Sequence, residues 1–124
     1  MRIALALCLA LLVCGCGRKQ PIQSHGKPVR HWLETLHSPD AKARKLAVVA
    51  LGHVGTADPA SLPALTGAVR DPDATVRAAA VLALLNIGSA AREAISVLTE
   101  ATKDKDARVR TYATRALGKI GPRS

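Results

Sequence analysis

The chain has 124 residues, and 18 Lys and Arg against 9 Asp and Glu give it a formal net charge of +9 at pH 7. A positive excess of this kind favours a partner with an acidic surface. Trp32 and Tyr112 are its only large aromatic residues, and both fall on apolar helical stripes, so no row of rings is available to stack on bases and we expect no nucleic-acid partner.

Residues 1–15 have the composition of an export signal. Met1-Arg2 is a short basic start, and the apolar run Ile3–Val13 follows it. This run is shorter than the roughly 20 residues that a membrane span needs, so we expect a signal peptide that is removed. The sequence Val13-Cys14-Gly15-Cys16 resembles a bacterial lipobox, which places an aliphatic and two small residues before the lipidated cysteine. The resemblance implies that Cys16 carries acyl chains such as palmitate and becomes the first mature residue.

Two alternatives for this segment stay open: a plain secretory signal with incidental cysteines, and an uncleaved anchor. If Cys16 is acylated, Cys8 and Cys14 leave with the signal, so no thiol is left for a disulfide and stability comes from packing alone. Several acyl chains hold a protein firmly at a membrane, whereas a single chain binds only marginally. The prediction is therefore a membrane-anchored lipoprotein of the bacterial cell envelope that faces the periplasm or the exterior.

Residues 16–27 contain the lipidated cysteine followed by a polar stretch without an apolar period. Such a stretch is predicted to be a flexible tether. At roughly 3.3 Å per residue, about ten residues of tether span at most ~35 Å. One repeat domain, residues 28–124, is expected beyond it.

Within this domain a segment recurs three times at a period of 33 residues. Its clearest copies are DAKAR at 40–44, DATVR at 73–77 and DARVR at 106–110. Repetition at this spacing indicates a solenoid, in which each unit buries one face against the next. The units are placed at about residues 28–55, 56–88 and 89–121.

The second half of each unit is predicted to be an amphipathic helix. In the middle unit the apolar residues follow the i, i+3, i+4, i+7 pattern of such a helix. These residues are Val76, Ala79, Ala80, Ala83, Leu84 and Ile87. The first halves carry shorter apolar stripes, and Pro39 and Pro72 separate the two halves of their units. The prediction is an all-α solenoid of six helices in three antiparallel pairs.

The ends of the three long helices are marked by Asp and Gly. Asp at an N-cap accepts the free N–H groups of the first turn, and Gly at a C-cap enters the left-handed region without strain. The starts are Asp40, Asp73 and Asp106, and the ends are Gly55, Gly88 and Gly121.

The run Asp71–Gly88, DPDATVRAAAVLALLNIG, resembles the HEAT-like repeat, in the short variant named after the phycobilisome lyases. The resemblance covers about residues 28–121, and it implies an α-solenoid of three HEAT-like helical hairpins. It does not imply one activity, because this repeat occurs in lyase subunits, scaffolds and many uncharacterised bacterial proteins.

The third unit is more polar than the first two. Thr114 stands where the earlier units have Val48 and Val81, and Arg115 stands where they have Val49 and Leu82. A polar outer face is what a terminal repeat requires. We therefore expect this unit to cap the stack.

One side of the long helices is predicted to carry basic residues and no acid. The positions opposite the core include Lys42, Lys45, His53, Arg108, Arg115 and Lys119. In HEAT-like stacks the second helices line the concave surface, where extended partners dock. This face is the candidate partner-binding site for an acidic protein surface, with anionic lipid headgroups or a merely solvated face as the alternatives.

Each long helix also has an Arg four residues after its first Asp, which is the spacing of a helical ion pair. The pairs are Asp40 and Arg44, Asp73 and Arg77, and Asp106 and Arg110. Strict recurrence at a structural boundary favours a structural ladder that ties neighbouring repeats. The alternative is a row of guanidiniums that bind anions.

No metal site, cofactor or catalytic set is predicted. His25 lies in the tether, His31 and His37 are six residues apart, and His53 lies near the end of the next helix. No His pair has i, i+4 spacing, and no Ser-His-Asp set or phosphate loop can be assembled. We expect a protein that is not an enzyme.

These features together predict a membrane-tethered, non-catalytic protein-protein interaction module of the cell envelope, either monomeric or weakly associated end to end. The second hypothesis is a structural or membrane-surface-binding protein that acts through nonspecific basic charge. The third is an accessory subunit of a bilin lyase, which only the repeat resemblance suggests.

Overall fold

The structure is a computed structural model that describes residues 20–121. The predicted signal peptide and Cys16 lie outside these residues. The described part contains six α-helices: α2 (Val29–Thr35), α3 (Ala41–Val54), α4 (Ser61–Ala68), α5 (Ala74–Ile87), α6 (Ile95–Ala101) and α7 (Ala107–Ile120). Two 3-10 segments, η2 (Gly55–Ala57) and η3 (Gly88–Ala94), join one unit to the next. The predicted all-α solenoid is confirmed.

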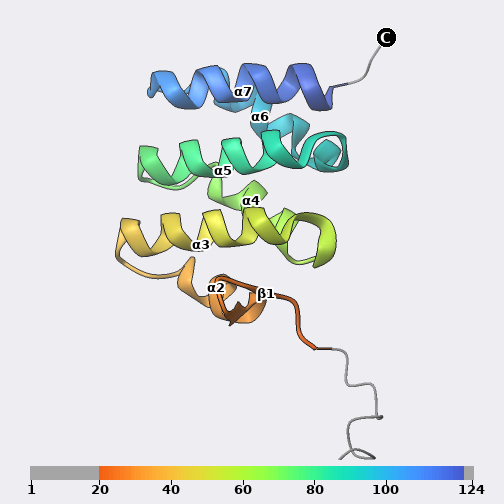
Figure 1. Cartoon of the computed structure of the whole chain (residues 1–124). Helices are drawn as coiled ribbons and strands as arrows, with labels where there is room; N and C mark the ends of the chain where they lie inside the picture. Colours follow the sequence, from red (N-terminus) through yellow and green to blue (C-terminus); the bar gives the residue numbers. More distant parts are fainter. Residues whose placement is uncertain (1–19, 122–124) are drawn as a thin grey trace, which may run out of the picture.

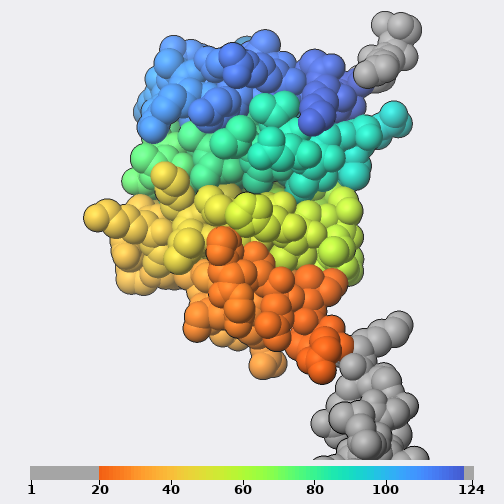
Figure 2. All heavy atoms as spheres, in the orientation of Figure 1, coloured from red at the N-terminus to blue at the C-terminus, as the bar shows by residue number. Residues whose placement is uncertain are grey.

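The long helices α3, α5 and α7 form one layer, and the short helices α2, α4 and α6 lie behind it (Figure 1). Each long helix packs against the next long helix and against the short helix of its own unit. The space-filling view shows the units as successive bands along the stack (Figure 2). The most extensive packing is therefore between the long helices.

The core runs through the stack between the units. Its largest fully buried apolar side chains are Leu51, Leu65, Leu84, Leu98, Ile120, Val48, Val76, Val81 and Val109. Ala47, Ala80 and Ala113, one in each unit, are 0% exposed. Their small side chains let the helices approach closely while the Leu and Val side chains fill the remaining volume.

Helix α3 approaches α5 closely at Gly52. A Cβ atom added to Gly52 would lie 2.9 Å from the Cβ atom of Ala83. Real Cβ atoms essentially never come this close, so only glycine fits between the two backbones at this point. A glycine in a helix interior is otherwise unfavourable, and here the close packing explains it.

Asp40, Asp73 and Asp106 cap the long helices as predicted. Asp40 accepts a hydrogen bond from the backbone N–H of Lys42 at 3.1 Å. Asp73 accepts from the N–H groups of Thr75 and Val76, and Asp106 does the same two and three residues on. These bonds satisfy N–H groups that have no partner within the helix.

The predicted left-handed C-caps are confirmed only in part. Gly55 and Gly88 have positive φ values of 56° and 74°, which favour glycine. Their ψ values of −129° and −142° differ from those of a left-handed helix. Gly121 is the C-cap of α7, so the predicted helix end is confirmed, but its φ of −58° and ψ of 160° show that the predicted left-handed conformation is wrong there. The chain leaves α7 in an extended direction, whereas at Gly55 and Gly88 it turns into a 3-10 segment.

The predicted tether is shorter than expected, because part of it folds. The strands β1 (Gln23–Ser24) and β2 (Lys27–Pro28) form an antiparallel hairpin. Its two turn residues, His25 and Gly26, both have positive φ, as a tight two-residue hairpin loop requires. The Nε1–H of Trp32 donates to the carbonyl oxygen of Ser24 at 2.9 Å. Strands of two residues leave no alternating pattern, so the sequence did not predict them.

The run Ala74–Ala101 is 28 residues long and contains an 18-residue window with a mean hydropathy of 1.5, so it is long and apolar enough to cross a membrane by length and composition alone. It is not one straight helix, because it comprises α5, η3 and α6, and Ala91 has non-helical dihedral angles. Helix α5 packs between α3 and α7. Core helices of a repeat stack have this composition, so the run is weak evidence for a membrane span.

The third unit presents the polar surface that its sequence predicts. Val48 and Val81 are 0% exposed because the next long helix covers them. Thr114 and Arg115 of α7 are exposed. The polar replacements therefore lie on solvent-facing surface in the described part of the chain.

Candidate functional site

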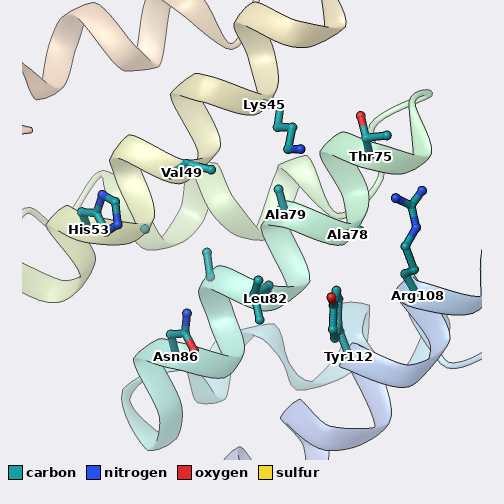
Figure 3. Close-up of a pocket in the computed structure, with 12 residues that line it drawn as sticks. Lys45, Val49, His53, Thr75, Ala78, Ala79, Leu82, Asn86, Arg108 and Tyr112 are labelled. Atoms are coloured by element: carbon teal, nitrogen blue, oxygen red, sulfur yellow. The ribbon is translucent and has the colours of Figure 1, made fainter. Parts of the chain in front are cut away.

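A groove of about 380 Å³ crosses the outer surface of the long-helix layer (Figure 3). We call it the groove throughout. Its lining residues are Lys45, Val49, Gly52, His53, Thr75, Ala78, Ala79, Leu82, Ala83, Asn86, Arg108 and Tyr112. They come from α3, α5 and α7, so all three units contribute to one surface.

The floor of the groove is apolar. Small residues of α5, such as Ala78 and Ala79, leave the hollow between its larger neighbours. Leu82 and Tyr112 project from α5 and α7 into it (Figure 3). Leu82 is 38% exposed, and exposing a large aliphatic side chain to water is unfavourable. An apolar floor of this kind can bury a side chain of a bound partner.

The two ends of the groove differ in chemistry. Lys45, Thr75 and Arg108 group at one end, and His53 and Asn86 lie at the other (Figure 3). Lys45 is exposed and forms no ion pair with any residue between 20 and 121. His53 Nδ1 lies 3.1 Å from Nε2 of His25, which belongs to the hairpin turn. One end therefore offers cations, and the other offers the imidazole of His53 and the carboxamide of Asn86.

The prediction that this face lacks any acid needs a correction at Arg108. Its Nη2 lies 3.0 Å from Oδ2 of Asp106, and its Nε lies 3.2 Å from Oδ1. The hydrogen bond from the Arg108 side chain, with those from the N–H groups of Arg108 and Val109, lowers the pKa of Asp106 to about 2. The N-cap carboxylate therefore partly neutralises Arg108, and Lys45 is the unpaired cation of the groove.

The predicted partner-binding residues do not all meet in the groove. Lys45, His53 and Arg108 line it. Lys42, Arg115 and Lys119 are exposed on the same helices but lie outside it. The Cε atom of Lys119 would lie 3.3 Å from a Cβ atom added to Gly88, so this side chain covers the end of α5.

Sequence reasoning missed the importance of two lining residues. Tyr112 was predicted to be a core residue, and it is only partly buried and faces the groove. Leu82 stands among the outward-facing positions, where a Leu is unusual. An apolar residue in a predicted solvent-facing column is the signal that could have identified the floor.

The ladder is present, but its acidic members differ from the predicted ones. Nε and Nη2 of Arg44 donate to Asp71 at 2.9 and 3.1 Å, and those of Arg77 donate to Asp104 at the same distances. Each pair joins one unit to the next and is mostly buried, with side-chain exposures between 11% and 16%. Asp40, Asp73 and Asp106 act as helix caps instead. The bidentate pairs bridge the units as the prediction required.

Burial raises the pKa of Asp104, but the hydrogen bonds from Arg77 and from the N–H of Asp106, with the charge of Arg77, lower it more. The net pKa of Asp104 is below its usual range. The hydroxyl and N–H of Thr75 lower the pKa of Asp73 in the same direction. Both carboxylates are therefore charged at neutral pH.

Residues 20–121 contain no group of three or more His, Cys, Asp or Glu side chains that could hold a metal ion. The closest pair of imidazoles, His25 and His53, contact each other directly.

Comparison with known proteins agrees with this architecture. The model of the family described as HEAT repeats matches residues 29–118, most of the chain. The crystal structure of an engineered protein, a Northeast Structural Genomics Consortium target, is similar at a TM-score of 0.63 and 26% sequence identity. The match covers 74% of this chain and 44% of that chain, so this chain spans less than half the length of the engineered one.

No curated protein matches the chain in sequence. The family match covers residues 29–118, which include the helices that form the groove and the ladder. The three stacked hairpins, their capped long helices and this match agree with one another, and the chain belongs to the HEAT-repeat family.

Proposed function

We propose that this protein is a membrane-tethered interaction module that binds a segment of a partner protein in the groove. HEAT repeats generally serve as scaffolds for protein-protein interaction. The observation that carries the proposal is the exposed Leu82 on the floor of a groove with an unpaired Lys45 at one end. The role is binding rather than catalysis.

The groove chemistry describes the partner segment. An apolar side chain of the partner buries Leu82 and the adjoining face of Tyr112, which removes apolar surface from water. A carboxylate near that side chain pairs with Lys45, and this pairing contributes to orientation and association rate. Asn86 at the far end can bond the partner's backbone. The partner segment is therefore mixed, with apolar and acidic residues.

The tether belongs to the same proposal. Acylation at Cys16, inferred from the lipobox resemblance, holds the stack at the bacterial envelope membrane. The hairpin of residues 23–28 packs against α2 and α3, so the proposed tether ends before residue 23. The proposed partner is then another envelope protein within reach of the anchor.

Site-specific cross-linking tests the groove. A photoreactive amino acid replaces Leu82 in the full chain, in intact cells of the source organism, and cross-linked proteins are identified by mass spectrometry. We expect one recurrent envelope protein whose yield falls when Lys45→Glu is added. The matched control places the same photoreactive residue at Leu46, which is 50% exposed but outside the groove.

Equal products from the Leu82 and Leu46 positions would refute the groove as the binding site. A second measurement addresses the charge alternative, since Lys42, Arg115 and Lys119 are exposed outside the groove. The unlipidated protein is mixed with vesicles that contain anionic lipid. Binding that falls steeply with salt, without any specific cross-link at Leu82, would instead support a membrane-surface protein.

A further inference from the structure

Arg110, the third arginine of the ladder, makes the same backbone hydrogen bonds as Arg44 and Arg77. Nη1 of Arg44 donates to the carbonyl oxygens of Ser38 and Pro39 at 2.9 and 3.1 Å, and Nη1 of Arg77 makes the equivalent two bonds at the same distances. Nη1 of Arg110 donates to the carbonyl oxygens of Asp104 and Lys105 at 2.8 and 2.9 Å. The same pair of backbone hydrogen bonds therefore orients the guanidinium of Arg110.

Only the acidic half of the pair differs. Nε and Nη2 of Arg44 and Arg77 bond a carboxylate of the following unit. Among residues 20–121, Nε and Nη2 of Arg110 have no carboxylate partner. Because the two Nη1 hydrogen bonds already orient the guanidinium, the free Nε and Nη2 donors of Arg110 define where a carboxylate would bind.

A second feature of the joint between units is also open at this end. Gly52 of α3 receives the Cβ atom of Ala83 from the next long helix. Gly118 is the equivalent residue of α7, two 33-residue periods later, while α5 has Leu85 at this position. No atom lies within 4 Å of a Cβ atom added to Gly118. Thr114 lies on α7 between Arg110 and Gly118 and is exposed. Its hydroxyl donates to the carbonyl oxygen of Arg110.

We propose that this end of the stack, at Arg110 and Gly118, is a docking site for a helix of another protein that begins with an aspartate turn. The internal pairs show the chemistry that fits. The acidic residue of each pair also accepts the N–H of the residue two positions later, which is the N-cap of a long helix. The partner helix therefore carries an Asp two residues before its N-cap, and a small residue about twelve positions after that Asp faces Gly118.

A second copy of this chain does not fit the site. The position that would meet Arg110 in a continued stack is occupied by Ser38, which has no carboxylate. The β1–β2 hairpin lies beside α2 at the opposite, N-terminal end of the stack, which a second copy would have to present to Arg110 (Figure 1). The partner is accordingly a different protein, and self-association is an outcome that would count against the proposal. The site is separate from the groove and does not depend on the proposed function there.

The first test uses the full ¹⁵N-labelled chain and N-acetyl-aspartate N-methylamide as the probe. The side-chain Nε–Hε signals of the arginines are followed by NMR at constant ionic strength. We expect a saturable shift at Arg110 with a Kd on the order of 10–100 mM, as for a single charge-assisted contact. Arg44 and Arg77, whose donors are occupied, stay unshifted. Arg115, exposed on the same helix, is the control for nonspecific charge.

The second test uses a peptide that copies residues 102–118, which contain Asp104, its N-cap and Ala116 twelve positions later. We expect it to bind the full chain about tenfold more tightly than the single aspartate analogue. Asp104→Asn in the peptide, or Arg110→Gln in the chain, abolishes this gain. Gly118→Gln, which meets open space in the free chain, weakens the peptide but not the single aspartate.

Each outcome decides the proposal. A shift at Arg110 that stays linear and equals that at Arg115 would overturn the carboxylate site. Peptide binding no tighter than that of the aspartate analogue would overturn the helix assignment, as would concentration-dependent dimerisation that Arg110→Gln removes. Leu82→Gln leaves all of these titrations unchanged, so failure here is distinguishable from failure of the groove.

Discussion

The ladder and the groove occupy the same three long helices but follow opposite rules. At the ladder, every unit has an arginine with the same two carbonyl contacts, at distances that agree within 0.2 Å between units. At the groove, the charged and polar positions are not kept from one unit to the next. Lys45 is followed by Ala78 and Thr111, and His53 is followed by Asn86 and Lys119.

This difference separates two roles within one repeat. A contact that joins each unit to the next must repeat, because the joint is the same every time. A surface that recognises one partner must vary along its length, because the partner is not periodic. The residues that break the period, Leu82 and Lys45 above all, are therefore the best candidates for specificity. The predictions below test this division, beginning with the largest effect.

Truncation of the core between the units should have the largest effect on stability. Leu84 is 0% exposed and packs in the middle unit. Leu84→Ala should lower the free energy of unfolding by about 2–5 kcal/mol, from lost burial and the cavity left behind. Urea unfolding followed by circular dichroism measures it, with the half-exposed Leu46→Ala as the control. A melting temperature within a few degrees of wild type would contradict the core placement of Leu84.

Loss of a ladder carboxylate should be the next largest effect. Asp104→Asn removes the charged acceptor of Arg77 in a site where both side chains are mostly buried. The expected cost is about 1.5–3 kcal/mol, as for hydrogen bonds to charged groups. Glu100→Gln is the matched control, since its pair with Arg70 is exposed at 63% and 65% and should contribute about 0–1 kcal/mol. Equal effects of both variants would show that the ladder is not structural.

Acid should weaken the stack through the same carboxylates. The pKa values of Asp73, Asp104 and Asp106 are all lower in the folded chain than the ordinary 3.8. The unfolded chain therefore binds more protons, so these groups stabilise the fold above pH 4 or so, and their contribution is lost as pH falls toward about 2. Urea midpoints measured across this range should fall with pH. A midpoint that stays constant or rises on acidification would contradict the argument.

A small gain is expected at Ser61. Its hydroxyl is fully buried and has no hydrogen-bond partner in the described residues. The equivalent residue of the next unit is Ala94, also 0% exposed. Ser61→Ala should raise the free energy of unfolding by about 1 kcal/mol, because an unsatisfied buried hydroxyl is removed. Thermal melting measures it, and a loss of stability would reveal a hydrogen bond that this structure does not contain.

Substitution of Leu82 in the groove should have the smallest effect on the free energy of unfolding. Leu82→Gln changes an exposed side chain, so the free energy of unfolding should stay within about 0.5 kcal/mol of wild type. The same variant should lose the partner in affinity capture by the full chain. A destabilisation comparable to that of Leu84→Ala would place Leu82 in the core and remove it from the binding surface.

Much of the fold was predictable because its signals are local and repeated three times. The apolar stripes, the Asp caps and the interruptions at Pro39 and Pro72 all depend on neighbours within one unit. Of the ladder, only the arginines were predictable, and their acidic partners were not. The recurrence of Arg44, Arg77 and Arg110 was visible, but the spacing favoured the acid within the same helix over Asp71 and Asp104 in the following unit.

The sequence by itself therefore determined the repeat, the six helices, the Asp N-caps of the three long helices and the polar third unit. Only the tertiary structure decided the acidic partners of the arginines, the packing of the hairpin of residues 23–28 against α3 and the orientation of Tyr112. The physical reason is distance along the chain: Arg44 and Asp71 are 27 residues apart, and His25 and His53 are 28 apart. Contacts of this range depend on how the units stack, and the groove exists only where α3, α5 and α7 meet.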